Sequence, residues 1–314
     1  MTRVIHTGQA LVDVVIEVPD LPVRGQNVMA TSATDYAGGA VTVLVAAARF
    51  GAACVHAGAT GTGPHGDLVR QALIADGICV SADPVPGRDT GICVVLVEPS
   101  AQRTFVTTLG AERDISVESL NISKPRSGDL VCVTGFSLAL ESTRVPLLAW
   151  LDTLAEGVVV VLDPGSAFAS LPARVREQML RCTDVWTSNA EEAGALLSAV
   201  GRPAAGAGLL ENTEALAPLM RGATVIVRDG AAGCAVLADG TTTMIPGYPQ
   251  TPIDTNGAGD THTGALLAEV AERGASWVEG CRRANAAAAI KVTRRGPTTS
   301  PTAAEVDAFL TTAD

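Results

Sequence analysis

The chain has 314 residues and a net charge of −11, and 47% of its residues are apolar but only 3% aromatic. This length fits one large α/β domain with a smaller attachment, and the core must be built from Ala, Val, Leu and Ile. The negative charge argues against a nucleic-acid binder, whose affinity depends on Lys and Arg, and against docking on an anionic membrane. Lysine occurs only at Lys124 and Lys291, and no Gly-Lys-Ser/Thr segment is present, which excludes a lysine-dependent phosphate loop.

The seven cysteines are scattered without C-x-x-C spacing, and the four histidines lie far apart and suggest no metal cluster. An odd number of unpatterned cysteines is typical of reduced thiols in a cytoplasmic protein. Residues 1–20 carry acidic residues inside their apolar run, which indicates strands and not a signal peptide. Apolar runs such as 157–162 are far too short to span a bilayer. We therefore expect a soluble, cytoplasmic protein.

Two stretches in the first third hold strand-like pairs without helices. The first pair surrounds a Pro- and Gly-bearing turn, and the second turns near Pro99–Gln102. These strands, at about 11–36 and 90–108, predict a small antiparallel sheet inserted in two pieces beside the main domain. A sheet with one uncovered face needs a partner, either a ligand beneath it or a second subunit. We therefore expect a ligand or a second subunit against this sheet, and the second possibility suggests a homodimer formed through it.

The rest of the chain alternates strand-like and helix-like runs. Short β-branched runs bounded by Gly, Pro or Asp occur at 130–135, 158–165, 184–189 and 223–230. Helices follow the first three runs, and a short strand pair with a turn at Asp239-Gly240 follows the fourth. This alternation predicts β-α-β units over a parallel sheet, within a single domain over 1–314. The C-terminal third is predicted to be helical at roughly 257–273, 275–293 and 302–311.

The segment GTGPHG at 61–66 matches G-x-G-x-x-G between a strand and a helix, with Asp83 where a ribose-binding acid would lie. The turn contains a proline, however, and the unit is not the first β-α element of the chain. A packing turn is therefore favoured over dinucleotide binding.

The segment DTNGAGDTHTGALL at 254–267 places two aspartates around a Gly-Ala-Gly step ahead of a helical pattern. If the helix starts near Gly257, its first amides are unpaired donors at the positive end of the helix dipole, and they could hold a phosphate. Asp260 would then lie beside the anion and could accept a proton from an attacking hydroxyl. Alternatively, Asn256 or Thr255 caps the helix and Asp260 only favours its dipole. These residues alone leave both interpretations open.

Several motifs together decide between them. DTNGAGDTHTGA resembles the C-terminal signature of the ribokinase-like, or PfkB-type, carbohydrate kinases, and YAGGAVTVLVAAARFGA (36–52) resembles their Gly-Gly signature. VVLDPG, the N-x-x-E of SNAEEA, VIVRDGAAG and ANAAAAIKVTRRGPTTS follow in family order, so the resemblance covers nearly the whole chain. It implies a Rossmann-like α/β ribokinase fold, with a mostly parallel central sheet flanked by helices and a small β-sheet lid.

The resemblance also implies the roles of individual residues. It makes Asp260 the catalytic base and Gly257, Ala258 and Gly259 the anion hole. It implies ATP and Mg²⁺ as cofactors, with Glu192 holding Mg²⁺ largely through water, as suits a hard cation. The implied ATP-binding residues are Asn189, Arg228, Gly230, Gly233 and Asn285, and the implied sugar-binding residues are Asp13, Gly38, Gly39 and Arg103. Loops with Asp254, Asn256, Lys291, Arg294, Gly296 and Ser300 match a monovalent-cation site, for which K⁺ is the candidate.

Three departures from the family pattern bear on which substrate the protein uses. Val43 stands where sugar kinases of this family usually carry an Asn, and a hydroxyl facing it would go unpaired at a cost of about 1–3 kcal/mol. The segment TGFSLAL lacks the Glu of the ribose-specific members. His262 stands where Phe is common, as a substrate contact or, more commonly, as packing. Ribose is therefore disfavoured. A fourth departure concerns the nucleotide and not the substrate: family members often have Thr or Ser where Arg228 stands, and a guanidinium there could pair with ATP phosphates.

The predicted function is ATP-dependent phosphorylation of a hydroxyl, with a primary hydroxyl expected, on a sugar or sugar-like small molecule. A nucleoside kinase of the same fold is the nearest alternative, although a lid poor in aromatic residues disfavours base stacking. A sugar-binding or regulatory protein that has lost turnover is the alternative from another class, and the intact Gly257–Asp260 turn disfavours it.

Overall fold

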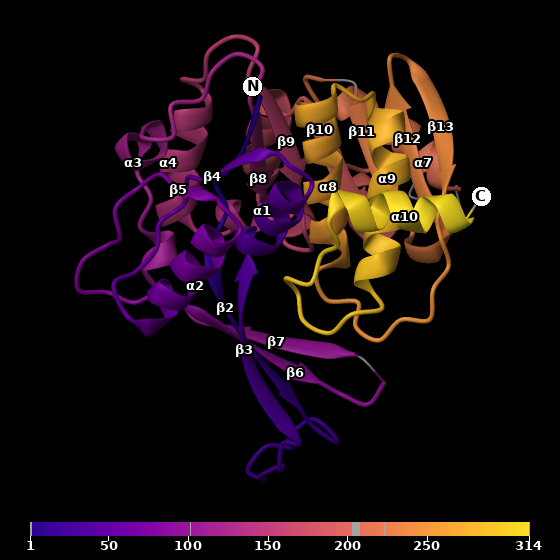
Figure 1. The fold of residues 1–314 in the computed structure, drawn as a ribbon. Coiled ribbons are helices and arrows are strands. Elements are labelled where there is room, and N and C mark those ends of the chain that lie inside the picture. The colour runs from indigo at the N-terminus through magenta and orange to yellow at the C-terminus, as the bar shows by residue number, and fades with distance from the viewer. Residues whose placement is uncertain (1, 101, 203–207, 223, 314) are drawn as a thin grey trace.

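A computed structural model describes residues 2–100, 102–202, 208–222 and 224–313 (Figure 1). Ala101, in the second expected lid turn, and Ala223, at the start of an expected strand, lie outside the described residues. The described part of the chain forms two sheets, one of nine strands and one of four.

The large sheet has the strand order β13–β12–β11–β10–β9–β8–β1–β4–β5. Its parallel strands are β1 (Arg3–His6), β4 (Ala53–His56), β5 (Cys79–Val80), β8 (Leu130–Thr134), β9 (Val159–Asp163), β10 (Val185–Asn189) and β11 (Thr224–Arg228). The antiparallel pair β12 (Gly233–Ala238) and β13 (Thr241–Pro246) completes one edge. The parallel strands are rich in Val and Ile and nearly continuously apolar, as expected for a sheet covered by helices on both faces.

Helices cover both faces of this sheet, and each face has its own apolar core. One core includes side chains of α1 (Ala40–Arg49), α2 (Pro64–Ala75), α8 (Ala258–Arg273), α9 (Trp277–Lys291) and α10 (Ala303–Ala313). The other includes side chains of α3 (Val117–Asn121), α4 (Glu141–Leu151), α5 (Ala173–Cys182), α6 (Ala190–Ala199) and α7 (Leu209–Leu216). Short 3₁₀ turns occur at Ala111–Arg113, Gly135–Leu138, Phe168–Ser170, Ala217–Leu219 and Gly230–Ala232. The three expected C-terminal helices are confirmed as α8, α9 and α10.

The small sheet, here called the lid sheet, has the order β3–β2–β6–β7 and projects from the main body (Figure 1). It consists of β2 (Ala10–Glu17), β3 (Ser32–Gly39), β6 (Ile92–Val97) and β7 (Arg103–Thr107). The pairs β2–β3 and β6–β7 are antiparallel, as expected, whereas the central strands β2 and β6 pair parallel. The parallel pair joins the two inserted pieces, a long-range pairing that local sequence signals do not report.

The segment 61–66 forms the packing turn that the sequence favoured. Pro64 begins α2, and the Asp89 carboxylate accepts hydrogen bonds from the amides of His65 and Gly66 at 3.2 and 2.9 Å. A protein carboxylate therefore already occupies the helix N-terminus at which a dinucleotide phosphate would bind. Within the described residues, no helix is long and apolar enough to cross a membrane.

Candidate active site

The N-terminus of α8 has the geometry of an anion-binding turn. Its N-cap is Gly257, in the left-handed conformation at φ 76°, and no side chain caps the helix. The alternative interpretation, in which the side chain of Asn256 or Thr255 caps this helix, is therefore wrong. Because first-turn amides have no intrahelical acceptor, those of Gly259 and Asp260 are available to an anion at the positive end of the helix dipole. A side chain at Gly257 would meet the Pro297 carbonyl oxygen at 2.6 Å, so only glycine fits there.

Asp260 lies in this first turn among other acidic side chains. Burial and, after it, the Asp163 carboxylate raise the pKa of its carboxyl to about 7, while Arg228 opposes the shift. A carboxyl group that titrates near neutral pH is suited to accept a proton from a hydroxyl and to release it again. The electrostatics therefore agree with a general base at this position.

Asp163 is a member of this cluster that the sequence reasoning did not single out. It ends β9, and its carboxylate accepts a hydrogen bond from Thr263 Oγ1 at 3.3 Å and pairs with the Arg228 guanidinium at 3.5 Å. It also contributes to the raised pKa of Glu192, whose main cause is burial. The available signal was its place in VVLDPG, since side chains at the carboxyl ends of parallel strands converge at one edge of the sheet.

Arg228 forms hydrogen bonds with the backbone of the anion-binding turn and of β10. Its guanidinium donates to the Gly259 carbonyl at 2.7 Å, and its Nε donates to the Ser188 carbonyl at 3.2 Å. The side chain also lines the cleft. The departure from Thr or Ser at this position therefore places a positive charge between the anion-binding turn and Asp163.

Asn189 and Glu192 form the N-terminal cap of α6. Asn189 Oδ1 accepts from the Glu192 amide at 2.8 Å, and Glu192 Oε2 accepts from the Asn189 amide at 3.0 Å. This reciprocal capping explains the N-x-x-E spacing by helix stability alone. Both residues nevertheless line the cleft, together with Asp163 and Asp260, so their side chains are also available to a ligand there.

The cleft in front of α8 has a volume of about 500 Å³ and brings together most of the expected nucleotide residues. Gly230 and Asn285 line it, whereas Gly233 is buried at the start of β12, where a Cβ would meet the Ile245 carbonyl oxygen at 2.1 Å. Asn285 Nδ2 donates to the Pro246 carbonyl at 3.1 Å, and its Oδ1 lies 3.1 Å from His262 Nε2. His262 is thus a buried partner of Asn285.

Asp13 and the Gly-Gly pair meet at the root of the lid sheet. Asp13 is half-buried on β2, and burial raises the pKa of its carboxyl to about 6. A Cβ at Gly38 would lie 2.3 Å from Asp13 Oδ2, so glycine is required for the carboxylate to lie here. Gly39 has φ 62° and is the N-cap of α1, and Val43 is buried one turn into that helix. The Asp13 charge contributes to the raised pKa of Asp260, which indicates that the two carboxyl groups lie within electrostatic reach of each other.

Arg103 connects the lid sheet to the segment before the anion-binding turn. It begins β7, and its guanidinium donates to Thr255 Oγ1. With Asp254 and Asn256, both residues line a small cavity of about 90 Å³ between the lid sheet and the main body. Arg103 therefore contacts the loop at the start of the DTNGAGD segment, residues 254–260.

The loops expected to surround a monovalent cation converge on Lys291. Its side chain is fully buried, and its ammonium donates to the carbonyl oxygens of Asp254 at 3.1 Å and Arg294 at 3.3 Å. The Asp254 carboxylate accepts from the amides of Asn256 and Gly296 at 2.8 and 2.9 Å. Ser300 instead shares a hydrogen bond of 2.8 Å with Thr261. The loops expected to surround a monovalent cation thus meet at the ammonium group of Lys291.

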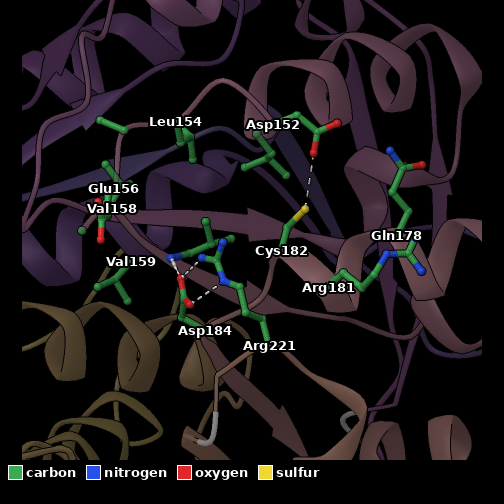
Figure 2. Close-up of a pocket in the computed structure, with 14 residues that line it drawn as sticks. Asp152, Leu154, Glu156, Val158, Val159, Gln178, Arg181, Cys182, Asp184 and Arg221 are labelled. Carbon is green, nitrogen blue, oxygen red and sulfur yellow. Dashed lines mark hydrogen bonds and ion pairs between the residues drawn. The ribbon is translucent and has the colours of Figure 1, made fainter.

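A second cavity, of about 770 Å³, lies away from these residues (Figure 2). Along its wall, Arg221 Nε donates to Asp184 Oδ1 at 2.9 Å, and Cys182 Sγ donates to Asp152 Oδ1 at 3.9 Å. None of the residues singled out from the sequence lines it. The smaller cleft in front of α8, which combines amide donors with carboxyl groups of raised pKa, is therefore the candidate active site.

Known proteins resemble the chain over nearly its whole length. The sequence pattern of the pfkB family carbohydrate kinase matches residues 1–304. An uncharacterized sugar kinase of Escherichia coli, YegV, is 28% identical, over 96% of this chain and 92% of its own. The ribokinase of Haemophilus influenzae is 29% identical, over 96% of both chains.

Solved structures show the same fold. Ribokinase from Giardia lamblia superimposes with a TM-score of 0.83 at 20% identity, over 100% of this chain and 99% of its own. Fructokinase from Vibrio cholerae, solved with fructose, ADP and calcium ion, gives 0.76 at 25% identity, over 99% of both chains. The fold and the cleft define a carbohydrate kinase of the ribokinase fold. The chain belongs to the pfkB family of carbohydrate kinases.

Proposed function

We propose that this carbohydrate kinase transfers the γ-phosphate of ATP to a primary hydroxyl of a sugar or sugar-like small molecule. The observation that carries the proposal is the uncapped N-terminus of α8, with a carboxyl group of pKa about 7, that of Asp260, in its first turn. Asp260 accepts the proton of the attacking hydroxyl, and the amides of the turn bind the phosphoryl oxygens. Asp13 accepts hydrogen bonds from sugar hydroxyls, and the lid sheet excludes water.

ATP is proposed to lie along the cleft, with its adenine near Asn285 and its phosphates toward Gly257–Gly259. Asp163, Glu192 and Asp260 fit a divalent cation nearby, because the Asp163 carboxylate helps to raise the pKa of the other two carboxyl groups, a repulsion that a cation would relieve. Mg²⁺, when bound there, supplies positive charge to the phosphates. Glu192 would hold it through water with Oε1, since Oε2 accepts the Asn189 amide and a hard cation keeps much of its hydration shell.

A substrate panel tests the function. ATP consumption is measured with sugars, sugar acids and nucleosides, each with and without Mg²⁺. We expect turnover with a sugar or sugar-like alcohol and little with ribose, because the buried Val43 offers no partner to a hydroxyl. Turnover confined to nucleosides would favour a nucleoside kinase, and no turnover with any compound would favour a binding protein.

The pH dependence of kcat/KM for ATP should report the ionisation of Asp260. The base works only when deprotonated, and the pKa of its carboxyl is raised to about 7, so kcat/KM should rise with pH to a plateau, with a midpoint near 7. Asp163→Asn removes a carboxylate that raises this pKa and should move the midpoint to lower pH. A midpoint unchanged in Asp163→Asn would contradict the assignment.

Gly38→Ala should raise KM for the sugar by about 10–100-fold, because the added Cβ would overlap the Asp13 carboxylate and displace it. KM for ATP should stay within about twofold, since Gly38 lies at the other end of the site. Gly208→Ala is the matched control, because a Cβ there meets nothing within 4 Å. Equal sugar KM values in the two variants would argue against a sugar site at Asp13.

We propose that Lys291 supplies the charge for which the sequence suggested K⁺. Its ammonium donates to two backbone carbonyls of the loops in question, those of Asp254 and Arg294. A second cation among the same oxygens would be repelled by the first. The residues therefore do not fit K⁺ while Lys291 is present, and the kinase should not need it.

We also propose a cytoplasmic homodimer formed through the lid sheet. On β7, an edge strand of this sheet, Phe105 and Val106 are 56% and 59% exposed, which supports a covering subunit. The seven free thiols suit a reducing compartment. Sedimentation should give twice the monomer mass for the native chain and the monomer mass for Phe105→Asp; a monomeric native chain would contradict the dimer.

A further inference from the structure

Two cysteines and a histidine gather beneath the nucleotide end of the cleft. Cys234 lies on β12, His262 on α8 and Cys281 on α9, and one ligand atom of each lies within 4.8 Å of the other two. All three side chains are buried. In the described part of the chain, this is the one set of three such residues grouped this closely. The fold thus joins residues whose scattered positions suggested no metal cluster.

One polar atom of this cluster lacks the partner that a buried group normally has. His262 Nδ1 has no hydrogen-bond partner among the described residues, whereas Nε2 lies 3.1 Å from Asn285 Oδ1. A buried ring nitrogen without a partner needs an explanation, and a role as a metal ligand is one. The thiolate is the form of cysteine that binds metals.

We propose that Cys234, His262 and Cys281 bind a soft metal ion such as Zn²⁺. Two thiolates and an imidazole are preferred ligands of such ions, at about 2.3 Å for Zn–S and about 2.0–2.1 Å for Zn–N. Ligand atoms around one tetrahedral ion are then about 3.3–3.8 Å apart, so side-chain shifts of about 1 Å bring the three together. The cysteines bind as thiolates and release any proton to solvent. Water completes the coordination, because the Asn285 amide oxygen lies 3.1 Å from His262 Nε2, the ring nitrogen opposite the unpartnered Nδ1.

The cleft is the route by which the ion enters. His262 and Asn285 line the cleft, whereas the two cysteines lie beneath them and do not line it. A nucleotide bound in the cleft would therefore cover the route. None of the three ligands takes part in the proposed phosphoryl transfer, so the site can exist whether or not that function is correct.

Titration of the full chain with Co²⁺ tests the site. A Cys79→Ser/Cys182→Ser host removes the two cysteines that are not buried. In this host, one equivalent of Co²⁺ should produce thiolate-to-metal charge-transfer absorption, and Zn²⁺ should abolish it by displacing the Co²⁺.

Adding Cys234→Ser to the host should weaken Co²⁺ binding by more than about 100-fold, since even indirect partners of a ligand change affinity by about 10–100-fold. Cys54→Ser is the matched control, because it removes a buried thiol outside the cluster and should leave the absorption unchanged. Absence of the absorption in the host, or equal absorption in the two variants, would overturn the site.

X-ray absorption of the Zn²⁺-loaded native chain supplies a test that needs no variant. We expect two sulfur ligands and at least one nitrogen around the zinc, and a shell of oxygen and nitrogen alone would overturn the proposal. A nonhydrolysable ATP analogue should also slow Co²⁺ loading; unchanged loading would overturn the cleft as entry route. Both measurements are made without turnover, so they separate this site from the kinase activity.

Discussion

Replacing Asp260 with Asn is expected to lower kcat by about 10²–10⁴-fold, while KM for ATP stays within about twofold. Asn has the shape of Asp but cannot accept the proton of the attacking hydroxyl, so the loss falls on the chemical step. The amides of the anion-binding turn remain in place, because they belong to the backbone of α8. Initial rates and equilibrium nucleotide binding measure the two effects separately.

The substitution should leave the fold intact. Asp260 lies near the Asp163 carboxylate, and burial and that neighbour raise the pKa of its carboxyl. Removing its negative charge therefore relieves repulsion. Asp152→Asn, in the second cavity (Figure 2), changes the charge equally away from the candidate site and should keep full activity. Retention of most of the activity in Asp260→Asn would exclude the residue as the base.

The main sheet and its helices could be predicted from the sequence because their signals are local. The β-branched runs at 130–135 and 184–189 recur as β8 and β10, and the C-terminal helices begin and end within a few residues of the expected bounds. The parallel pairing of β2 and β6 could not be predicted, since it depends on contacts between distant segments.

The site was predictable where function depends on a contiguous motif. The anion-binding turn and Asp260 lie within one heptapeptide, 254–260. Their relative positions are therefore set by local geometry and could be predicted without knowing the fold. Asp163 and the cluster of Cys234, His262 and Cys281 are assembled from separate elements, and only the fold brings them together. The sequence also could not distinguish two uses of the same side chains. Asn189 and Glu192 match a ligand motif and a capping box equally well, and the structure shows the cap.

Lys291→Ala is expected to lower kcat by about 10–100-fold and to make the enzyme dependent on K⁺. The substitution removes an ammonium that joins the Asp254 and Arg294 carbonyls, which lie in the loops that support the anion-binding turn. It leaves a space lined by backbone oxygens, into which K⁺ can fit. Activity in K⁺ should exceed that in Na⁺ at matched ionic strength by about tenfold, whereas the native chain should respond by less than about twofold.

Lys291→Met separates the loss of charge from the creation of space. Methionine fills much of the volume of the lysine chain without its charge, so the carbonyls stay unpaired and K⁺ cannot enter; activity should be low in either salt. Both variants lose a buried donor, at a cost of about 1–3 kcal/mol for a carbonyl left unsatisfied, so folding is verified by circular dichroism before the assays. Several-fold activation of the native chain by K⁺ would contradict Lys291 as the internal cation, and this measurement needs no variant to fold. Equal rescue of both variants would place the K⁺ effect elsewhere, because only the alanine variant opens the space between Asp254 and Arg294.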